Sequence, residues 1–318
     1  MEDEARSFMT HALPLSGAAR IAAGNVASDF DLTQEELLQA LELAADVKRR
    51  PEAYRSVMKG RIVSLLFEKP SLRTRVTFEI AAKQLGGDAI QSIGPVGGRE
   101  PVKDVARNLE RWTDLIVART FSQSTIDDLA AWANVPVINA LSDLYHPCQA
   151  LADYLTLLEC TGRLTGVTLA WVGDGNNVAH SLIYGAARLG VRMRIATPPG
   201  YEPDRSVVAD AKREGGDVTL MHDPREAVAG ADAVYTDVWP SMGKEDQAET
   251  RQEVFRAYQV SCQLMRKAGS QALFMHSQPA SRGAEVTDEV MDSRHSIVYR
   301  QSENRLHMQK AIFLALLS

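Results

Sequence analysis

The sequence predicts an α/β protein made of two doubly wound parallel-sheet domains, with helices on both faces of each sheet and interdomain helices linking them. The first observation is the length of 318 residues, beyond the roughly 250–300 residues at which one hydrophobic core stops growing. The second is an alternation of short apolar runs with helical stretches, which is typical of parallel strands covered on both faces. The third is that both halves of the chain show this alternation.

The first predicted helix begins at a capping box. Thr33 can accept a hydrogen bond from the backbone N–H of Glu36, and the Glu36 carboxylate can reach back to the N-cap. Leu32 and Leu37 flank the box as a hydrophobic staple, and Pro51 ends the helix.

The remaining elements follow in alternation. Apolar runs predict strands over residues 61–67, 115–118, 135–139, 168–172, 192–196, 217–221, 233–236 and 272–276. Helices are predicted over 74–85, 102–113, 126–133, 149–160, 178–189, 204–214, 225–228 and 303–317. The stretch 149–160 is the natural junction between the halves, while residues 1–28 lack a sustained period and are expected to form a partly ordered leader.

Charge and cysteine content exclude several classes of protein. The 35 basic and 41 acidic residues give a net charge of −6, whereas binders of nucleic acid or membrane surfaces carry a basic excess. Cys148, Cys160 and Cys262 cannot form a disulfide framework and suggest a reducing compartment. The acidic start of the chain does not resemble a secretory signal, so we expect a soluble, cytoplasmic protein.

A basic string lies where the strand 61–67 gives way to a helix. Residues 71–75 read Ser-Leu-Arg-Thr-Arg, which brings two hydroxyl groups and the guanidinium groups of Arg73 and Arg75 to a helix N-terminus. Free backbone N–H groups and arginine side chains together favour a phosphate. Taken alone, the string is equally compatible with a solvated basic turn.

Further polar residues follow other predicted strands. Arg119 ends one strand, and residues 146–149 (His-Pro-Cys-Gln) follow the next, where an imidazole and a carboxamide could polarise a carbonyl group and hold an amide. Asp237 could accept hydrogen bonds from an ammonium group or could only cap a turn. Residues 173–177 suggest a dinucleotide site, but Val178 stands where that motif needs a glycine.

Taken together and in this order, these strings resemble the aspartate/ornithine transcarbamylase family, most closely its ornithine carbamoyltransferases. The likeness is carried by residues 71–75, 119, 146–149, 237–243 and 304–305. It implies transfer of a carbamoyl group from carbamoyl phosphate to the δ-amine of L-ornithine, giving L-citrulline and phosphate in arginine biosynthesis. It also implies a homotrimer that needs no metal or organic cofactor, since positioning and electrostatics suffice.

The resemblance assigns roles to matching residues. Carbamoyl phosphate would be held by Ser71, Leu72 (through its N–H), Arg73, Thr74, Arg119, His146, Gln149 and Arg305. Ornithine would be held by Asn177, Asp237, Ser241 and Met242, and the catalytic residues would be Arg119, His146, Asp237 and Ser277. The implied domains are 1–150 for carbamoyl phosphate and 151–302 for ornithine, with the C-terminal helix 303–318 packed back on the first.

One segment departs from the family pattern. Where the family usually has His-Cys-Leu-Pro, residues 276–279 read His-Ser-Gln-Pro. Ser277 keeps a small polar group but cannot ionise as a thiol can near neutral pH. The alternatives are therefore a carbamoyltransferase for another amine, or a catalytically weak or silent relative. The loop 94–100 is likewise open to two interpretations, a contact with a neighbouring subunit's site or a flexible surface turn.

Overall fold

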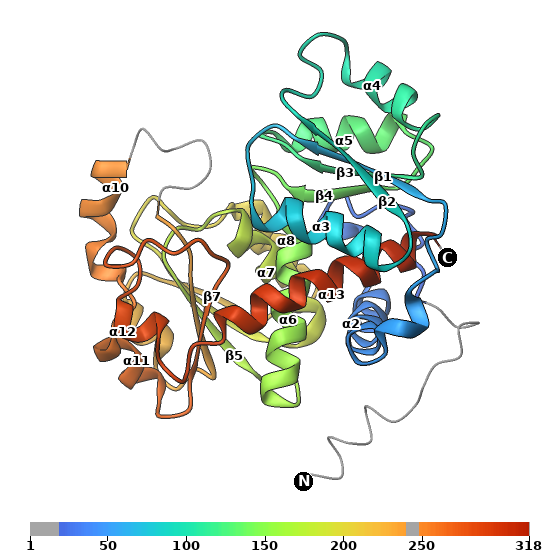
Figure 1. The fold of residues 1–318 in the computed structure, drawn as a ribbon. Coiled ribbons are helices and arrows are strands. Elements are labelled where there is room, and N and C mark those ends of the chain that lie inside the picture. The colour runs from blue at the N-terminus through green and yellow to red at the C-terminus, as the bar shows by residue number, and fades with distance from the viewer. Residues whose placement is uncertain (1–18, 240–247, 318) are drawn as a thin grey trace.

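The computed structural model describes residues 19–239 and 248–317, which form two parallel sheets (Figure 1). Sheet A contains β1 (Ile62–Phe67), β2 (Asp88–Ile93), β3 (Leu115–Arg119) and β4 (Val137–Leu141) in the order β2-β1-β3-β4. Sheet B contains β5 (Thr168–Val172), β6 (Arg192–Ala196), β7 (Val218–Met221), β8 (Ala233–Thr236) and β9 (Leu273–His276) in the order β7-β6-β5-β8-β9. All neighbouring strands pair in parallel, which confirms the predicted fold class.

Helices surround both sheets. The first half contains η2 (Asp29–Asp31), α2 (Gln34–Arg49), η3 (Pro51–Tyr54), α3 (Arg73–Gln84), α4 (Val102–Leu109), α5 (Gln123–Trp132) and α6 (Pro147–Thr161). The second half contains α7 (Asn177–Leu189), α8 (Arg205–Arg213), α9 (Pro224–Val228), α10 (Ala248–Phe255), η5 (Arg256–Tyr258), α11 (Cys262–Ala268), α12 (Asp288–Met291) and α13 (Val298–Leu317). The predicted capping box is formed at α2, where the Thr33 hydroxyl accepts from the Glu36 N–H at 3.2 Å.

Alternate residues of each strand enter different cores, as the two-residue period of a strand requires. In sheet A, Leu66 and Ile116 pack with residues of α4 and α5, whereas Leu65 and Val117 join a core that includes α2, α3 and α13. That same core continues through α6 and α7 to one face of sheet B. Burial of apolar side chains thus joins the two halves into one packed unit.

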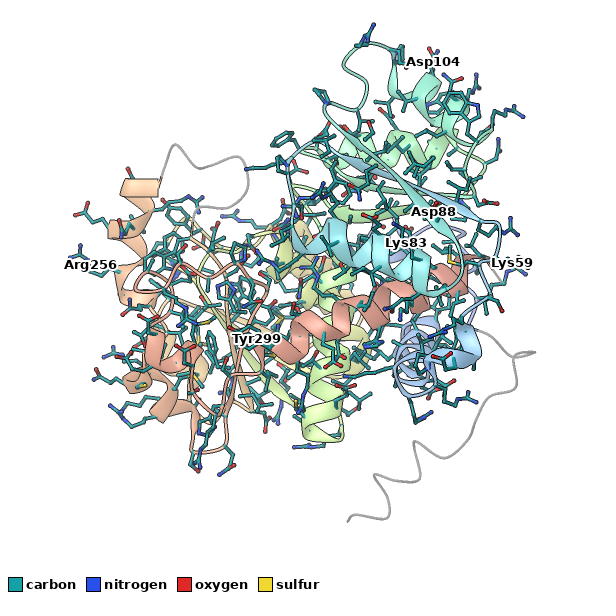
Figure 2. The ribbon with its side chains drawn as sticks, in the orientation of Figure 1. Lys59, Lys83, Asp88, Asp104, Arg256 and Tyr299 are labelled. Atoms are coloured by element: carbon teal, nitrogen blue, oxygen red, sulfur yellow. The ribbon has the colours of Figure 1, made fainter. Side chains whose placement is uncertain are left out.

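Two long helices cross between the halves. α6 leads from β4 to β5, and α13 runs from the sheet B side to α2 and α3 (Figure 1). Charged and polar side chains such as Lys59, Arg256 and Tyr299 point outward (Figure 2). Among the described residues, no helix combines the length and apolar character that crossing a membrane requires.

The structure differs from the sequence prediction in several places, and α10, α11 and α12 are among the elements that were not predicted. β2 was not predicted, because as an edge strand it buries little and carries exposed residues on both faces. α13 begins at Val298 rather than at residue 303. In the segment expected to be a partly ordered leader, Val26 is fully buried and forms a parallel bridge to Ile138 of β4; residues 1–18 lie outside the described part of the chain.

Candidate functional site

Each sheet has a topological switch point, where connections leave neighbouring strands in opposite directions. In sheet A it lies between β1 and β3, and in sheet B between β5 and β8. Ligands of open α/β sheets bind outside the carboxyl ends of strands at such points. The segments after these four strands contain most of the residues that the sequence singled out.

The N-terminus of α3 is the first part of the sheet A site. Leu72 takes the N-cap position with no side-chain cap, and its own side chain is 69% exposed. Leu72 can therefore offer only its backbone to a ligand. The positive end of the helix dipole and the free N–H groups of this first turn favour an anion there.

Two arginines from distant parts of the chain meet this turn. Arg119 lies next to Phe67 in the sheet, and its Nη1 donates to Ser71 Oγ at 3.1 Å and to Thr74 Oγ1 at 3.5 Å. Arg305, from α13, donates through Nη2 to Thr74 Oγ1 at 2.6 Å. The structure thus brings Ser71, Thr74, Arg119 and Arg305 together in one cluster, which we call the arginine cradle.

The cradle has an excess of positive charge. Burial, followed by repulsion from Arg73, lowers the pKa of Arg119 to about 10. Burial and the charge of Arg119 likewise lower the pKa of Arg305 to about 10. Nε of Arg119 and Nε of Arg305 are buried without a hydrogen-bond partner among the described residues. Buried donors of this kind normally have partners, so the cradle is suited to complete itself with a bound anion.

His146 and Gln149 lie at the start of α6, and the charges of Arg305 and Arg119 act on His146. The backbone N–H of His146 donates to Ser181 Oγ at 2.8 Å, which fixes the start of the helix. Burial and the charges of Arg305 and Arg119 hold the pKa of His146 well below its usual value, so the imidazole is neutral at pH 7. Its Nδ1 and the Oε1 of Gln149 have no partner among the described residues.

A carboxylate rather than a cation dominates the sheet B site. Asp237 follows β8 and accepts from Asn176 Nδ2 and from Ser277 Oγ, each at 2.8 Å. Burial raises the pKa of Asp237 above its ordinary value. Asn177, which the resemblance assigned to ornithine binding, donates to the Ser142 carbonyl at 2.6 Å. Ser241 and Met242 lie outside the described residues.

Residues 276–279, which differ from the family pattern, have a defined structure next to Asp237. His276 Nε2 faces Glu285 Oε1 at 3.1 Å, and its Nδ1 accepts from the Gln278 backbone at 2.8 Å. Gln278 has a left-handed backbone with φ of 58°. Ser277 therefore presents its hydroxyl to Asp237 from a segment held by a buried imidazole–carboxylate pair.

Some residues at the site were not predicted, and one expected residue faces elsewhere. Asn176 was singled out only within a glycine-rich string, although it caps α7 through its Oδ1 and holds Asp237 through its Nδ2. Asp153 follows Gln149 by four residues, a spacing that puts both on one helix face. Arg75, which the basic string placed near the phosphate, donates to Gln91 of β2 at 3.2 Å.

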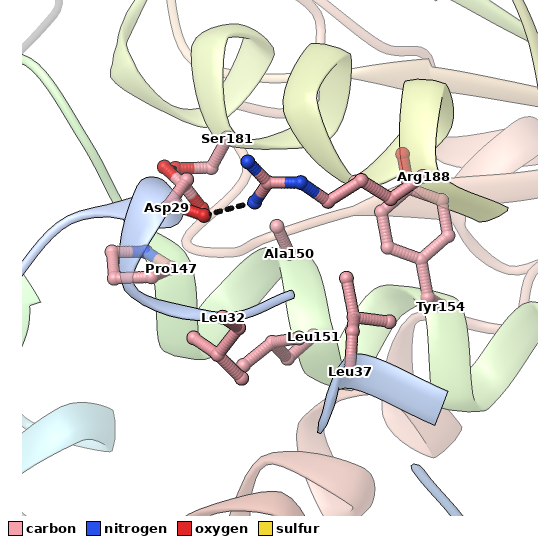
Figure 3. A pocket seen from close by; sticks show the side chains of 10 residues that line it. Asp29, Leu32, Leu37, Pro147, Ala150, Leu151, Tyr154, Ser181 and Arg188 are labelled. Carbon is pink, nitrogen blue, oxygen red and sulfur yellow. Dashed lines mark hydrogen bonds between the residues drawn. The ribbon is translucent and has the colours of Figure 1, made fainter. Parts of the chain in front are cut away.

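A small cavity lies behind His146, between η2, α2, α6 and α7 (Figure 3). Its volume of about 10 Å³ is at the lower limit for a single water molecule. Asp29 accepts from Ser181 Oγ at 2.6 Å, and Arg188 donates to its backbone carbonyl. Asp29 thereby supports, through Ser181, the backbone that carries His146.

The fold and the site together define a class: a double parallel-sheet protein with a buried cationic cradle suited to an anion at one sheet and a buried carboxylate at the other. The model of the aspartate/ornithine carbamoyltransferase carbamoyl-phosphate-binding domain matches residues 25–159, and that of the Asp/Orn-binding domain matches residues 165–316. The chain belongs to the aspartate/ornithine carbamoyltransferase family.

Individual relatives are similar over nearly their whole length. The ornithine carbamoyltransferase of Shewanella oneidensis is 50% identical over 295 residues, which cover 91% of this chain and 97% of the relative. That of Carboxydothermus hydrogenoformans is 48% identical, covering 90% of this chain and 95% of the relative. The solved structure of ornithine carbamoyltransferase from Pyrococcus furiosus has a TM-score of 0.89 at 44% identity, covering 96% and 99% of the two chains.

Proposed function

We propose that this chain transfers the carbamoyl group of carbamoyl phosphate to the δ-amine of L-ornithine, releasing L-citrulline and phosphate. The observation that carries the proposal is the arginine cradle, whose buried Nε atoms have no partner among the described residues. The family membership and the ornithine carbamoyltransferases similar to the chain over at least 90% of its length support the same reaction.

The phosphate would bind at the cradle. We assign its oxygens to the side chains of Ser71, Arg73, Thr74 and Arg119 and to the backbone N–H of Leu72. His146, Gln149 and Arg305 would hold the carbamoyl group. Arginine is suited to the phosphate because its planar fork matches two oxygens at once.

Ornithine would bind at the sheet B site. Asp237 would accept from its α-ammonium group, with Asn177, Ser241 and Met242 completing the contacts to the amino-acid end. The δ-amine reacts only after losing its proton, and a cationic, partly desolvated neighbourhood favours the neutral amine. The site at each switch point would thus bind one of the two substrates.

Attack of the amine on the carbamoyl carbon places negative charge on the carbamoyl oxygen. Thr74, Arg119 and neutral His146 have N–H or O–H groups suited to stabilise this charge. Each such donor is worth about 2.7–4 kcal/mol in enzymes where it was removed. The bond between the carbamoyl carbon and the phosphate oxygen then breaks, the phosphate takes the proton that the attacking nitrogen loses, and the cradle would hold the hydrogen phosphate dianion that leaves.

Ser277 and its contact with Asp237 keep the acceptor site assembled. The 2.8 Å hydrogen bond shows that serine can hold this carboxylate in place without a thiol. We therefore place Ser277 with Asp237 in the acceptor site, and the ornithine carbamoyltransferases similar to this chain favour ornithine over another acceptor.

We also propose a cytoplasmic homotrimer acting in arginine biosynthesis. The family resemblance supports the trimer, and a relative from Pyrococcus furiosus is described as an anabolic ornithine carbamoyltransferase. Mass photometry tests the assembly: a species of about three 34.9 kDa chains is expected, and a monomer at micromolar concentration would contradict it.

A citrulline assay tests the reaction. Purified protein is incubated with carbamoyl phosphate and, in turn, ornithine, lysine, putrescine or aspartate, with phosphate release measured in parallel. We expect carbamoylated product and stoichiometric phosphate from ornithine alone. Product from another amine but not from ornithine, or binding of both substrates without turnover, would overturn the proposal.

A further inference from the structure

A buried carboxylate that has no place in the proposed reaction lies one helical turn from Gln149. Asp153 of α6 is fully buried. Its Oδ1 accepts from Gln149 Nε2 at 2.8 Å and from Gln301 Nε2 of α13 at 2.9 Å, and its Oδ2 faces the Tyr235 hydroxyl of β8 at 2.9 Å. The Asp153 carboxyl group thus connects Gln149 in the first turn of α6 with β8 of sheet B and with the C-terminal helix α13.

The chemistry of this group determines which way the Gln149 amide faces. A carboxylate oxygen only accepts hydrogen bonds, so the NH₂ end of Gln149 must point to Asp153 and its Oε1 must point away. Burial raises the pKa of Asp153 to about 7. A proton on Oδ2, with the Tyr235 oxygen as acceptor, would leave Oδ1 an acceptor and the amide orientation unchanged.

The other end of the Gln149 amide is a vacant acceptor. Oε1 is buried and has no hydrogen-bond partner among the described residues, which leaves one strong acceptor in the first turn of α6. Without the carboxylate, either end of the amide could face the ligand, because the two ends differ little in shape.

We propose that Asp153 is a positioning residue that holds the Gln149 carboxamide with its oxygen toward the ligand, and so selects an acyl phosphate carrying an NH₂ group over one carrying a methyl group. This inference rests on the proposed function. The NH₂ group of carbamoyl phosphate can donate to Oε1, whereas the methyl group of acetyl phosphate would leave that buried oxygen without a partner. Sites built around such a hydrogen bond reject analogues that lack the donor.

Gln301 extends the same arrangement to the acceptor side. While its Nε2 is held by Asp153, its Oε1 accepts from the His276 backbone N–H at 2.9 Å. The amide orientation set by Asp153 therefore also supports the strand end that carries Ser277.

Calorimetric titration of carbamoyl phosphate and of acetyl phosphate, without ornithine, tests the proposal. The quantity compared is the ratio of the two dissociation constants. Asp153→Leu removes the acceptor at similar volume and is expected to lower the preference for carbamoyl phosphate about tenfold or more. Asp153→Asn can still present an oxygen to both amides and is expected to keep the preference within about twofold.

Two comparisons separate positioning from general destabilisation. Thr156→Val removes a different buried polar group of α6, the Thr156 hydroxyl, which accepts from Asn304 at 3.0 Å. This variant should leave the preference for carbamoyl phosphate unchanged. In a Gln149→Met background the preference is already lost, so Asp153→Leu should lower it no further. An unchanged preference in Asp153→Leu, or additive losses in the double variant, would overturn the proposal.

Neutron diffraction of the unaltered protein gives a test that does not depend on a variant's folding. Nitrogen and oxygen of the Gln149 amide differ clearly in neutron scattering, and deuterium on Nε2 should point at Asp153 Oδ1. Deuterium pointing into the cradle would overturn the proposal. Failure of the wild-type protein to form citrulline would instead remove the proposed function, whatever the amide orientation.

Discussion

The ends of the two sheets are built on opposite electrostatic plans. At sheet A, burial lowers the pKa of both Arg119 and Arg305, neighbouring guanidinium charges lower it further, and their Nε atoms lack partners among the described residues. At sheet B, Asp237 already receives hydrogen bonds from Asn176 and Ser277. The first site presents buried donors without partners among the described residues, whereas the carboxylate of the second is already held by the protein.

This difference indicates where substitutions act. At the arginine cradle, a ligand oxygen would supply acceptors to the buried donors, so losing one arginine should remove binding energy for the ligand. Around Asp237, the protein's own donors define the geometry, so losing one of them shifts the carboxylate but leaves the other donor. Changes in the cradle should therefore be larger than changes in the residues that support Asp237.

The largest effect is expected from Arg119→Met. Met keeps the apolar stem but removes the guanidinium group that contacts Ser71 and Thr74. We expect kcat/KM for carbamoyl phosphate to fall by roughly 10³ or more, because phosphate binding and oxyanion stabilisation are both lost. Steady-state kinetics measure this, with Arg111→Met, whose side chain is 76% exposed, as control. A loss below tenfold would contradict the assigned role.

Asp237→Asn should produce the next largest change, and in the other substrate. The substitution keeps the shape of the side chain but removes the charge that an ornithine ammonium group needs. We expect KM for ornithine to rise about 100-fold, while the dissociation constant for carbamoyl phosphate changes little. Asp217→Asn, an exposed site on the sheet B half, is the control. Equal losses for both substrates would show that the two sites are not separate.

Ser277→Cys should have a smaller effect, and a favourable one. A thiol keeps a polar group next to Asp237 and can ionise near neutral pH, which a hydroxyl cannot. We expect turnover to rise a few-fold, whereas Ser277→Ala should lower it because one donor to Asp237 is lost. Turnover that is unchanged or lower in Ser277→Cys would show that serine is the better partner in this chain.

The smallest effect on activity is expected at Asp29, behind His146. Burial raises the pKa of Asp29 from 3.8 to about 7, so between these values the folded chain retains a proton that the unfolded chain releases. The free energy of unfolding therefore falls as pH rises through this window. Asp29→Asn should reduce the fall in the free energy of unfolding across this pH window, by roughly 4 kcal/mol at most.

Urea unfolding at several pH values between 4 and 8 measures the slope. Asp128→Asn, an exposed acid on α5, serves as the control and should leave the slope unchanged. An unaltered slope in Asp29→Asn would show that this carboxyl group is ionised throughout.

Strongly periodic or capped elements could be predicted from the sequence, but those that depend on tertiary contacts could not. The strands 168–172 and 233–236 match the structure because each is a buried apolar run, and 192–196 matches because its apolar residues alternate with arginines on the other face. β2 was missed because an edge strand has a weak apolar pattern. Val26 was assigned to a loose leader because its bridge to Ile138 joins segments far apart in the sequence.

The same distinction holds within the site. Ser71, Arg73 and Thr74 form one local string, and a helix N-terminus after a strand is visible in the sequence. The contact from Arg305 to Thr74 spans 231 residues, so no local pattern contains it and only the family resemblance suggested it. The network around Asp153 joins four elements and could not be inferred from spacing alone.

We infer that the phosphate of carbamoyl phosphate completes the arginine cradle independently of the acceptor. Calorimetric titration of carbamoyl phosphate into the protein without ornithine tests it most directly. Saturable binding that Arg119→Met weakens by at least 100-fold and Asp237→Asn leaves unchanged is the predicted result. Binding of equal strength in the wild-type protein and Arg119→Met, or no binding until ornithine is added, would contradict the account.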